Sequence, residues 1–84
     1  MITIITKGYC PYCAAATTLL NKVGVEYINI DITLKLDLYN QVKEITGSQT
    51  VPQVFIWDIH GKFLGWFTEL NELHKSGELE KLIK

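Results

Sequence analysis

The stretch from Ile2 to Cys13 reads ITIITKGYCPYC and is the most informative part of the 84-residue chain. Its first five residues, 2–6, are all β-branched and predict a short buried strand. Pro11 suits the first position of a helix, and the three alanines that follow Cys13 are strong helix formers. The stretch therefore predicts a strand and a short loop that lead into a helix, with Cys10 and Cys13 at the start of that helix.

Strands and helices are expected to alternate beyond this stretch. We expect a helix over Pro11–Val23, a strand over Val25–Asp31, a helix over Leu34–Thr46, a strand over Val51–Trp57, a turn over Asp58–Gly61, a strand over Lys62–Phe67, a helix over Thr68–Lys75 and a short turn over Glu78–Ile83. The order is β-α-β-α-β-β-α. Its first unit favours parallel strands with a right-handed crossover, and its hairpin adds antiparallel strands. The sequence thus predicts one α/β domain over residues 1–84, with a four-stranded mixed sheet flanked by helices.

Helical spacing also predicts which side chains point inward. In the first helix these are Cys13, Ala16, Thr17, Leu20 and Val23. In the second helix they are Leu34, Leu38, Val42 and Ile45. Thr68 is expected to cap the last long helix through its hydroxyl group.

The composition excludes several classes of protein. The chain is 48% hydrophobic, which is too apolar for a disordered protein. Its eight lysines against nine acidic residues leave no basic surplus for binding nucleic acid. No apolar run approaches the roughly 20 residues of a membrane span, and the N-terminal residues do not resemble a signal peptide. We therefore expect a cytoplasmic monomer with neither nucleic-acid nor membrane partners.

The two cysteines have a spacing that indicates chemistry more than a structural disulfide, because a bridge between them would close a very short loop. Cys10 is expected at the N-cap, where the unpaired amides of the first helical turn stabilise a thiolate. Lys7 adds a nearby positive charge. Cys13 lies one turn along the helix on its inward face and should be less accessible. We expect Cys10 to attack disulfides and Cys13 to resolve the mixed disulfide.

Three motifs resemble the dithiol glutaredoxins, a family of the thioredoxin-fold superfamily. They are Cys10-Pro11-Tyr12-Cys13 preceded by Lys7, the segment Thr50–Ile56, and the tail Ser76–Leu82. The resemblance implies a thioredoxin fold and glutathione-dependent exchange between thiols and disulfides. It also implies that Pro52 is in the cis form and faces the two sulfurs.

The resemblance further implies a glutathione site. Its residues would be Lys7, Tyr12, Gln49, Thr50, Val51, Pro52, Thr68 and Glu69. The backbone of Val51 would pair with the cysteine part of glutathione, and Lys7 with Gln49 would receive the glycine carboxylate. Tyr12 would line the groove. The γ-glutamyl end of glutathione would lie near Thr68 and Glu69.

One region departs from the family pattern. The hairpin segment Trp57–Lys62 is a few residues longer than in the family, and Gly65-Trp66 stands where the family has two glycines. The indole of Trp66 either turns away from the glutathione site or narrows it. Four aromatic residues in this region are expected either to pack in the hairpin or to form a docking surface: Trp57, Phe63, Trp66 and Phe67.

Two alternatives to a glutathione-dependent enzyme remain open. One is a redoxin of similar sequence that thioredoxin reductase recharges. The other is a carrier of an iron–sulfur cluster held between two chains. We expect no metal site in the chain, because His60 and His74 are not close to the cysteines in sequence. Expected partners are glutathione and disulfide-containing or glutathionylated proteins, with ribonucleotide reductase as the acceptor that the resemblance suggests.

Overall fold

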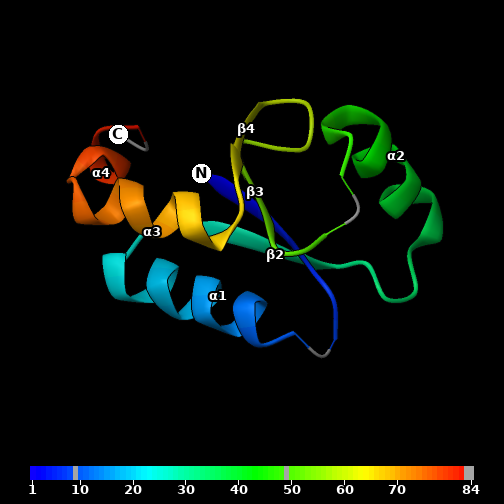
Figure 1. Cartoon of the computed structure of the whole chain (residues 1–84), viewed down its shortest axis with the longest axis horizontal. Helices are drawn as coiled ribbons and strands as arrows, with labels where there is room; N and C mark the ends of the chain where they lie inside the picture. The colour runs from blue at the N-terminus through cyan, green and yellow to red at the C-terminus, as the bar shows by residue number, and fades with distance from the viewer. Residues whose placement is uncertain (9, 49, 83–84) are drawn as a thin grey trace.

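The structure is a computed structural model that describes residues 1–8, 10–48 and 50–82. Its elements are β1 (Ile2–Thr6), α1 (Pro11–Val23), β2 (Tyr27–Asp31), α2 (Leu36–Thr46), β3 (Gln53–Ile56), β4 (Lys62–Gly65), α3 (Phe67–Lys75) and α4 (Glu78–Leu82). The expected β-α-β-α-β-β-α order is confirmed, and the short helix α4 stands where a turn was expected (Figure 1). No helix among the described residues is long and apolar enough to cross a membrane.

The four strands form one mixed sheet with the order β2-β1-β3-β4. β1 pairs in parallel with β2 and antiparallel with β3, and β4 is the antiparallel partner of β3. The parallel pair is joined by α1, whereas the antiparallel pair β3 and β4 is joined by a hairpin, because only antiparallel neighbours can be connected by a short turn. The expected four-stranded mixed sheet is therefore confirmed.

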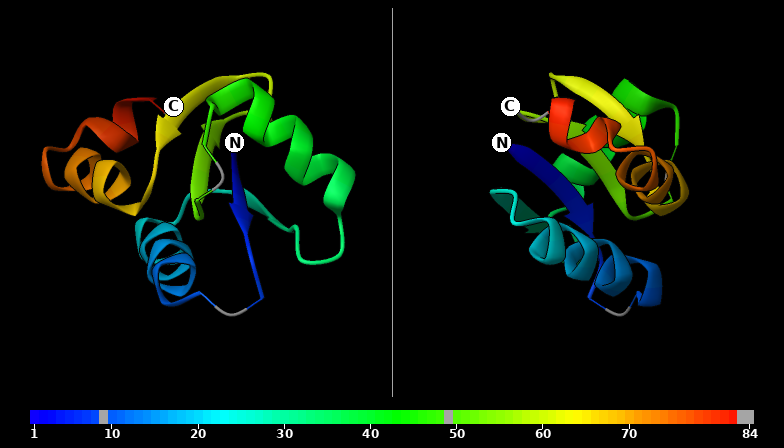
Figure 2. Two further views of the ribbon diagram at one scale, coloured as in Figure 1. Left: turned by 45° about the vertical axis from the view of Figure 1, so that its right-hand side comes forward. Right: turned by 90° about the vertical axis from the view of Figure 1, so that its left-hand side faces the viewer.

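Helices cover both faces of this sheet. The left view of Figure 2 shows α1, α3 and α4 on one side of the strands and α2 on the other. The core cluster on the first side contains Ile2, Ile4, Ala16, Leu19, Leu20, Val54, Leu70 and Leu79. The cluster on the second side contains Ile5, Ile32, Val42, Phe55 and Ile59. Ile4 and Ile5 of β1 enter opposite clusters, as the two-residue period of a strand requires.

Helix α1 has the boundaries that its sequence predicts. It begins at Pro11, and Gly24 ends it with a φ of 82°, a left-handed conformation that favours glycine. Its buried residues are Cys13, Ala16, Leu19 and Leu20. Of the expected inward residues, Thr17 and Val23 are only half-buried. Leu19, which was not expected to point inward, is buried because α1 packs against α3 as well as against the sheet.

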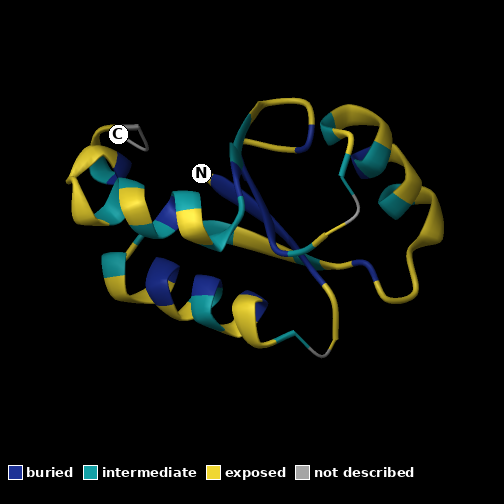
Figure 3. Cartoon of the chain, viewed as in Figure 1, coloured by how far each residue is buried: buried dark blue, intermediate teal, exposed yellow. Residues whose placement is uncertain are grey.

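Helix α2 departs from its expected start and its expected inward face. It begins at Leu36, and among its residues 36–46, all of which the structure describes, only Val42 is buried. Leu34 precedes the helix and is 95% exposed, and Ile45 is 45% exposed, so their predicted inward position is wrong. Because Leu34 lies in the preceding loop, it does not follow the helical period that the prediction assumed. Figure 3 shows that the outer surface of α2 is largely exposed.

The hairpin between β3 and β4 leaves the sheet one residue earlier than expected. Trp57 adopts a φ of 75°, which ends the strand, and its side chain is 64% exposed. The backbone N–H of Trp57 donates to the Met1 carbonyl at 2.9 Å, and its carbonyl accepts from the Thr3 hydroxyl. Ile59 then turns inward and is 7% exposed. The longer hairpin thus supplies an apolar residue to the core cluster beneath α2.

The first turn of α3 is capped by a carboxylate where a hydroxyl cap was expected. Trp66 is the N-cap residue, so the prediction of Thr68 as the cap is wrong, and Thr68 is exposed within the first turn. Glu69 Oε1 accepts from the Trp66 N–H at 2.8 Å. Gly65 has a φ of 113°, and a Cβ there would lie 2.8 Å from Glu69 Oε1. A side chain at residue 65 would therefore displace the cap.

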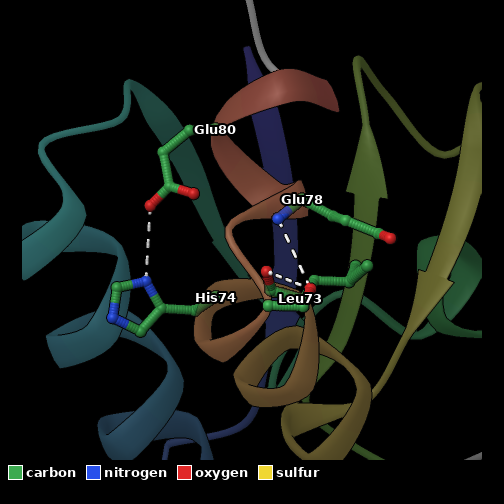
Figure 4. A network of polar contacts seen from close by, with 5 residues as sticks. Leu73, His74, Glu78 and Glu80 are labelled. Atoms are coloured by element: carbon green, nitrogen blue, oxygen red, sulfur yellow. Dashed lines mark hydrogen bonds and ion pairs between the residues drawn. The ribbon is translucent and has the colours of Figure 1, made fainter.

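Polar contacts connect α4 to the end of α3 (Figure 4). His74 Nδ1 and Glu80 Oε1 lie 3.5 Å apart. The Ser76 hydroxyl donates to the Leu73 carbonyl at 3.1 Å and accepts from the Glu78 N–H at 3.4 Å. These contacts hold α4 in place while Leu79 is buried in the core. His74 is thus a structural partner of α4, far from both cysteines in the sequence.

Candidate active site

Cys10 occupies the N-cap of α1, as its sequence position predicts. Its backbone is extended, and its sulfur accepts from the Cys13 N–H at 3.2 Å. The thiol of Cys10 also donates a long hydrogen bond of 3.9 Å to the Val51 carbonyl. Its side chain is partly exposed, and both cysteines are free thiols. A sulfur at this position lies where the helix dipole and the first-turn amides stabilise negative charge.

Cys13 has a different environment one turn along the same helix. It is 5% exposed, which confirms its expected inward position. Burial raises the pKa of its thiol to about 12, and a hydrogen bond with Cys10 acts in the same direction. The negative charges of Cys10 and Asp31 raise this pKa further, whereas a hydrogen bond with the backbone of Lys7 lowers it. At neutral pH the Cys13 thiol therefore keeps its proton in the reduced protein.

A cavity of about 230 Å³ lies beside both cysteines, between the ends of β1 and β2. Asp31 lines it, and Thr33 donates to Asp31 Oδ1 through its N–H at 2.9 Å and its hydroxyl at 2.5 Å. These hydrogen bonds lower the pKa of the Asp31 carboxyl. The Thr33 hydroxyl oxygen also accepts from the Gly8 N–H at 2.9 Å. The loop before Cys10 is thus attached to the loop after β2.

The segment before β3 brings a second wall to the site. The peptide bond between Val51 and Pro52 is cis, which confirms that expectation, and Pro52 is buried. Gln53 is 1% exposed, and its amide Nε2 donates to the carbonyls of Ser48 at 3.0 Å and Thr50 at 2.9 Å. No motif in the sequence predicts a role for Gln53. A polar residue within the apolar run of β3 was the signal that could have identified it as a clamp for this loop.

A hollow of about 150 Å³ lies between the cis proline and the start of α3. It is lined by Tyr12, Val51, Pro52, Trp66, Phe67 and Thr68. Tyr12 is 66% exposed, and its ring centroid lies 6.1 Å from that of Phe67. The Trp66 ring packs edge-on against Phe63 at 5.2 Å. The hollow therefore remains open although Trp66 stands where the family pattern has glycine.

The other predicted site residues lie in several places. Lys7 is exposed and places its ammonium 4.9 Å from the centroid of the Tyr39 ring. Thr50 is exposed, and its hydroxyl lies 3.0 Å from that of Ser48. Glu69 caps α3 and lines a separate hollow between β4, α3 and the start of α4. Gln49 lies outside the described residues.

The arrangement suits thiol–disulfide exchange. A partly exposed sulfur stands at a helix N-terminus, and a second, protonated sulfur lies directly behind it. The first sulfur can form a mixed disulfide, and the second can displace the bound group. Among the described residues, no group of three or more His, Cys, Asp or Glu side chains could hold a metal ion.

Comparisons with known proteins agree with this chemistry. The glutaredoxin family model matches residues 2–63. Glutaredoxin of Neisseria meningitidis serogroup B is 35% identical over 83 residues, which cover 98% of this chain and 94% of that protein. Glutaredoxin-1 of Saccharomyces cerevisiae is 37% identical over 99% of this chain and 79% of its own length.

Solved structures agree as well. The crystal structure of the buckwheat glutaredoxin–glutathione complex superposes with a TM-score of 0.85 at 29% identity, and the match covers 98% of this chain and 74% of that one. The mixed sheet and flanking helices are therefore those of the thioredoxin fold. The chain belongs to the glutaredoxin family and is a thiol–disulfide oxidoreductase.

Proposed function

We propose that this protein is a cytoplasmic, glutathione-dependent oxidoreductase that reduces protein disulfides and mixed disulfides with glutathione. The observation that carries the proposal is the position of the Cys10 sulfur. It caps α1, is partly accessible, and lies beside the Val51 carbonyl next to the cis proline. The similar buckwheat protein has been solved with glutathione bound, which supports the choice of reductant.

The reaction begins at Cys10. Its thiolate attacks a disulfide, forms a mixed disulfide with one sulfur, and releases the other sulfur as a thiolate that takes up a proton. Cys13 then attacks the Cys10 sulfur, gives up its own proton, and releases the second substrate thiol. The protein is left with a Cys10–Cys13 disulfide, and the substrate has gained two electrons. Two molecules of glutathione restore the dithiol and leave as glutathione disulfide.

Glutathione fits the open side of this site. The backbone of Val51 offers a strand-like edge to an extended tripeptide. The α3 N-terminus beside Thr68 favours a carboxylate through its amides and dipole. Lys7 is an exposed positive charge suited to a second carboxylate. Because the Trp66 ring lies against Phe63 and the hollow of about 150 Å³ stays open, this arrangement favours glutathione over recharging by thioredoxin reductase.

The physiological partners are proposed from family resemblance. Disulfide-containing and glutathionylated proteins would be substrates, and ribonucleotide reductase is a candidate acceptor. The cluster carrier between two chains stays a prediction, since a shared cluster would draw ligands from a second chain and from glutathione. Visible absorbance after anaerobic purification would identify it.

The test is NADPH consumption with hydroxyethyl disulfide as substrate in two parallel systems. One contains glutathione and glutathione reductase, and the other contains thioredoxin reductase alone. We expect turnover only in the first system. Turnover only in the second would overturn the proposed donor. A Trp66→Gly variant that gained activity with glutathione would then identify the indole as the obstruction.

A further inference from the structure

The most exposed large apolar side chains near the active site lie before and at the start of α2. Leu34 is 95% exposed and Leu36 is 67% exposed. They border a groove of about 510 Å³, here called the leucine groove, lined by Lys7, Ile32, Thr33, Leu34, Leu36 and Tyr39. Burying a leucine side chain is worth roughly 1.5–3 kcal/mol, so this exposure costs free energy unless a partner covers it.

The leucine groove is continuous with the active site. Lys7 lines both this groove and the cavity that contains the two cysteines. Thr33, which also lines the groove, accepts a hydrogen bond from Gly8 in the loop before Cys10. Lys7 therefore borders both the cavity beside the cysteines and the leucine groove.

Positive charge borders the apolar floor of the groove. The ammonium groups of Lys7 and Lys43 lie 4.9 Å and 5.1 Å from the centroid of the same Tyr39 ring. The Asp31 carboxylate near the groove accepts two hydrogen bonds from Thr33. Asp31 lines the neighbouring cavity and not the groove, so the charges that contact the groove's Tyr39 are the two ammonium groups. The surface is in this respect complementary to an apolar side chain with an acidic side chain next to it.

We propose that the leucine groove binds an extended segment of a disulfide-containing protein substrate, with a leucine-like side chain between Leu34 and Leu36 and an acidic side chain beside Lys7 and Lys43. The area that two leucine side chains can bury is far smaller than the roughly 800 Å² per partner of a stable interface, so the contact is transient. This inference rests on the proposed function only in that the substrate carries a disulfide.

The groove binds the substrate segment during the half-reaction in which the substrate disulfide is reduced. Cys10 attacks one substrate sulfur and releases the other. Cys13 then forms the disulfide with Cys10 and releases the first substrate sulfur as a thiol. Lys7 is available to glutathione only after the substrate segment has left. The two ligands therefore use Lys7 in turn.

The experiment uses pre-reduced protein with excess reductant removed, so that no glutathione is needed. Three synthetic peptides with an internal disulfide differ in the residues that flank their cysteines: leucine with glutamate, serine with glutamate, and leucine with lysine. The rate of peptide reduction in a single turnover is followed by acid quenching and chromatography. We expect the leucine–glutamate peptide to react about tenfold faster than the serine–glutamate peptide, as the burial of one leucine predicts.

Substitutions in the groove then test which residues cause the preference for leucine and for glutamate. Leu34→Ser combined with Leu36→Ser should remove the advantage of leucine over serine, and Lys43→Gln should reduce the advantage of glutamate over lysine by about threefold. The matched control is Ile45→Ser, which removes an exposed apolar residue of α2 that does not line the groove. It should leave the order of the three peptides unchanged.

Two results would overturn the inference. One is equal rates with all three peptides. The other is a loss in the double leucine variant that is the same for every peptide and for hydroxyethyl disulfide, which would indicate general damage to the site. Failure of glutathione dependence would be seen separately, since the parent protein would then reduce peptides in a single turnover but show no NADPH consumption with glutathione.

Discussion

The two faces of the sheet are packed in different ways. On the face covered by α1 and α3, α1 buries four residues, including Cys13. On the other face, α2 buries Val42 and leaves Leu36 and Ile45 exposed (Figure 3). The α1 face holds the Cys13 sulfur in the core, whereas the outer surface of α2 is exposed, and on it lies part of the proposed leucine groove. The two faces therefore differ in how many residues their helices bury, four in α1 against one in α2.

The largest expected change is the loss of reductase activity when either cysteine is replaced. Cys10→Ser should abolish all reductase activity, because the remaining thiol, that of Cys13, is buried and cannot reach a substrate disulfide. Cys13→Ser should abolish reduction of peptide disulfides but keep reduction of glutathione mixed disulfides, which glutathione itself can complete. Both activities can be measured with purified variants in the coupled NADPH assay. Equal losses in the two variants would contradict this division of roles.

Core truncation tests the difference in packing directly. Leu20→Ala removes a fully buried side chain from the α1 face and should reduce the free energy of unfolding by about 3 kcal/mol. Val42→Ala on the other face removes less volume and should cost about half as much. Leu36→Ala should stay within about 0.5 kcal/mol, since its side chain is exposed.

Urea unfolding of the three variants gives these values when the slopes agree with that of the parent protein. A cost for Leu36→Ala as large as that for Leu20→Ala would mean that α2 is packed as tightly as α1. The comparison between the two faces would then be wrong.

A smaller loss of stability is expected from a substitution at Trp66, which lies between the β3–β4 hairpin and the active site. Trp66→Ala removes the edge-on contact with Phe63, which itself packs against Phe55 at 5.2 Å. We expect a loss of about 1–2 kcal/mol in the free energy of unfolding. The KM for glutathione should change less than twofold, because the hollow is already open. A large fall in this KM would show that the indole obstructs the site in solution.

The smallest effect concerns the proton on Cys13. In a Cys10→Ser background, the pKa of Cys13 should stay above the ordinary value of about 8.5, because burial still opposes the thiolate. Adding Asp31→Asn removes a negative charge and should lower this pKa. Thiolate absorbance near 240 nm against pH measures both values. An unchanged or higher value after Asp31→Asn would exclude a role for this carboxylate.

The expectations from sequence were accurate where a local pattern decides the structure. The spacing of Cys10 and Cys13 placed one sulfur at the N-cap and the other inward, since both positions follow from the start of one helix. The expectations from sequence were less accurate for α2 and for the start of α3. Helical spacing suggested that Leu34 is buried, and a threonine at residue 68 suggested a hydroxyl cap. Neither pattern shows that the loop before α2 extends two residues further than expected, to Lys35. Neither shows that Glu69, a residue of the first turn of α3, caps that helix.

The sequence alone thus determined the order of elements, the family and the positions of Cys10 and Cys13 at the start of one helix, because these depend on residues close together in the chain. Only the folded structure decided which leucines stay exposed, where the Trp66 ring packs and how strongly Cys13 holds its proton. The Trp66 ring packs on Phe63 across the end of β4. The other two depend on contacts between residues far apart in the chain, as between Cys13 and Asp31. Such contacts arise only when the loops of β1 and β2 meet at one edge of the sheet.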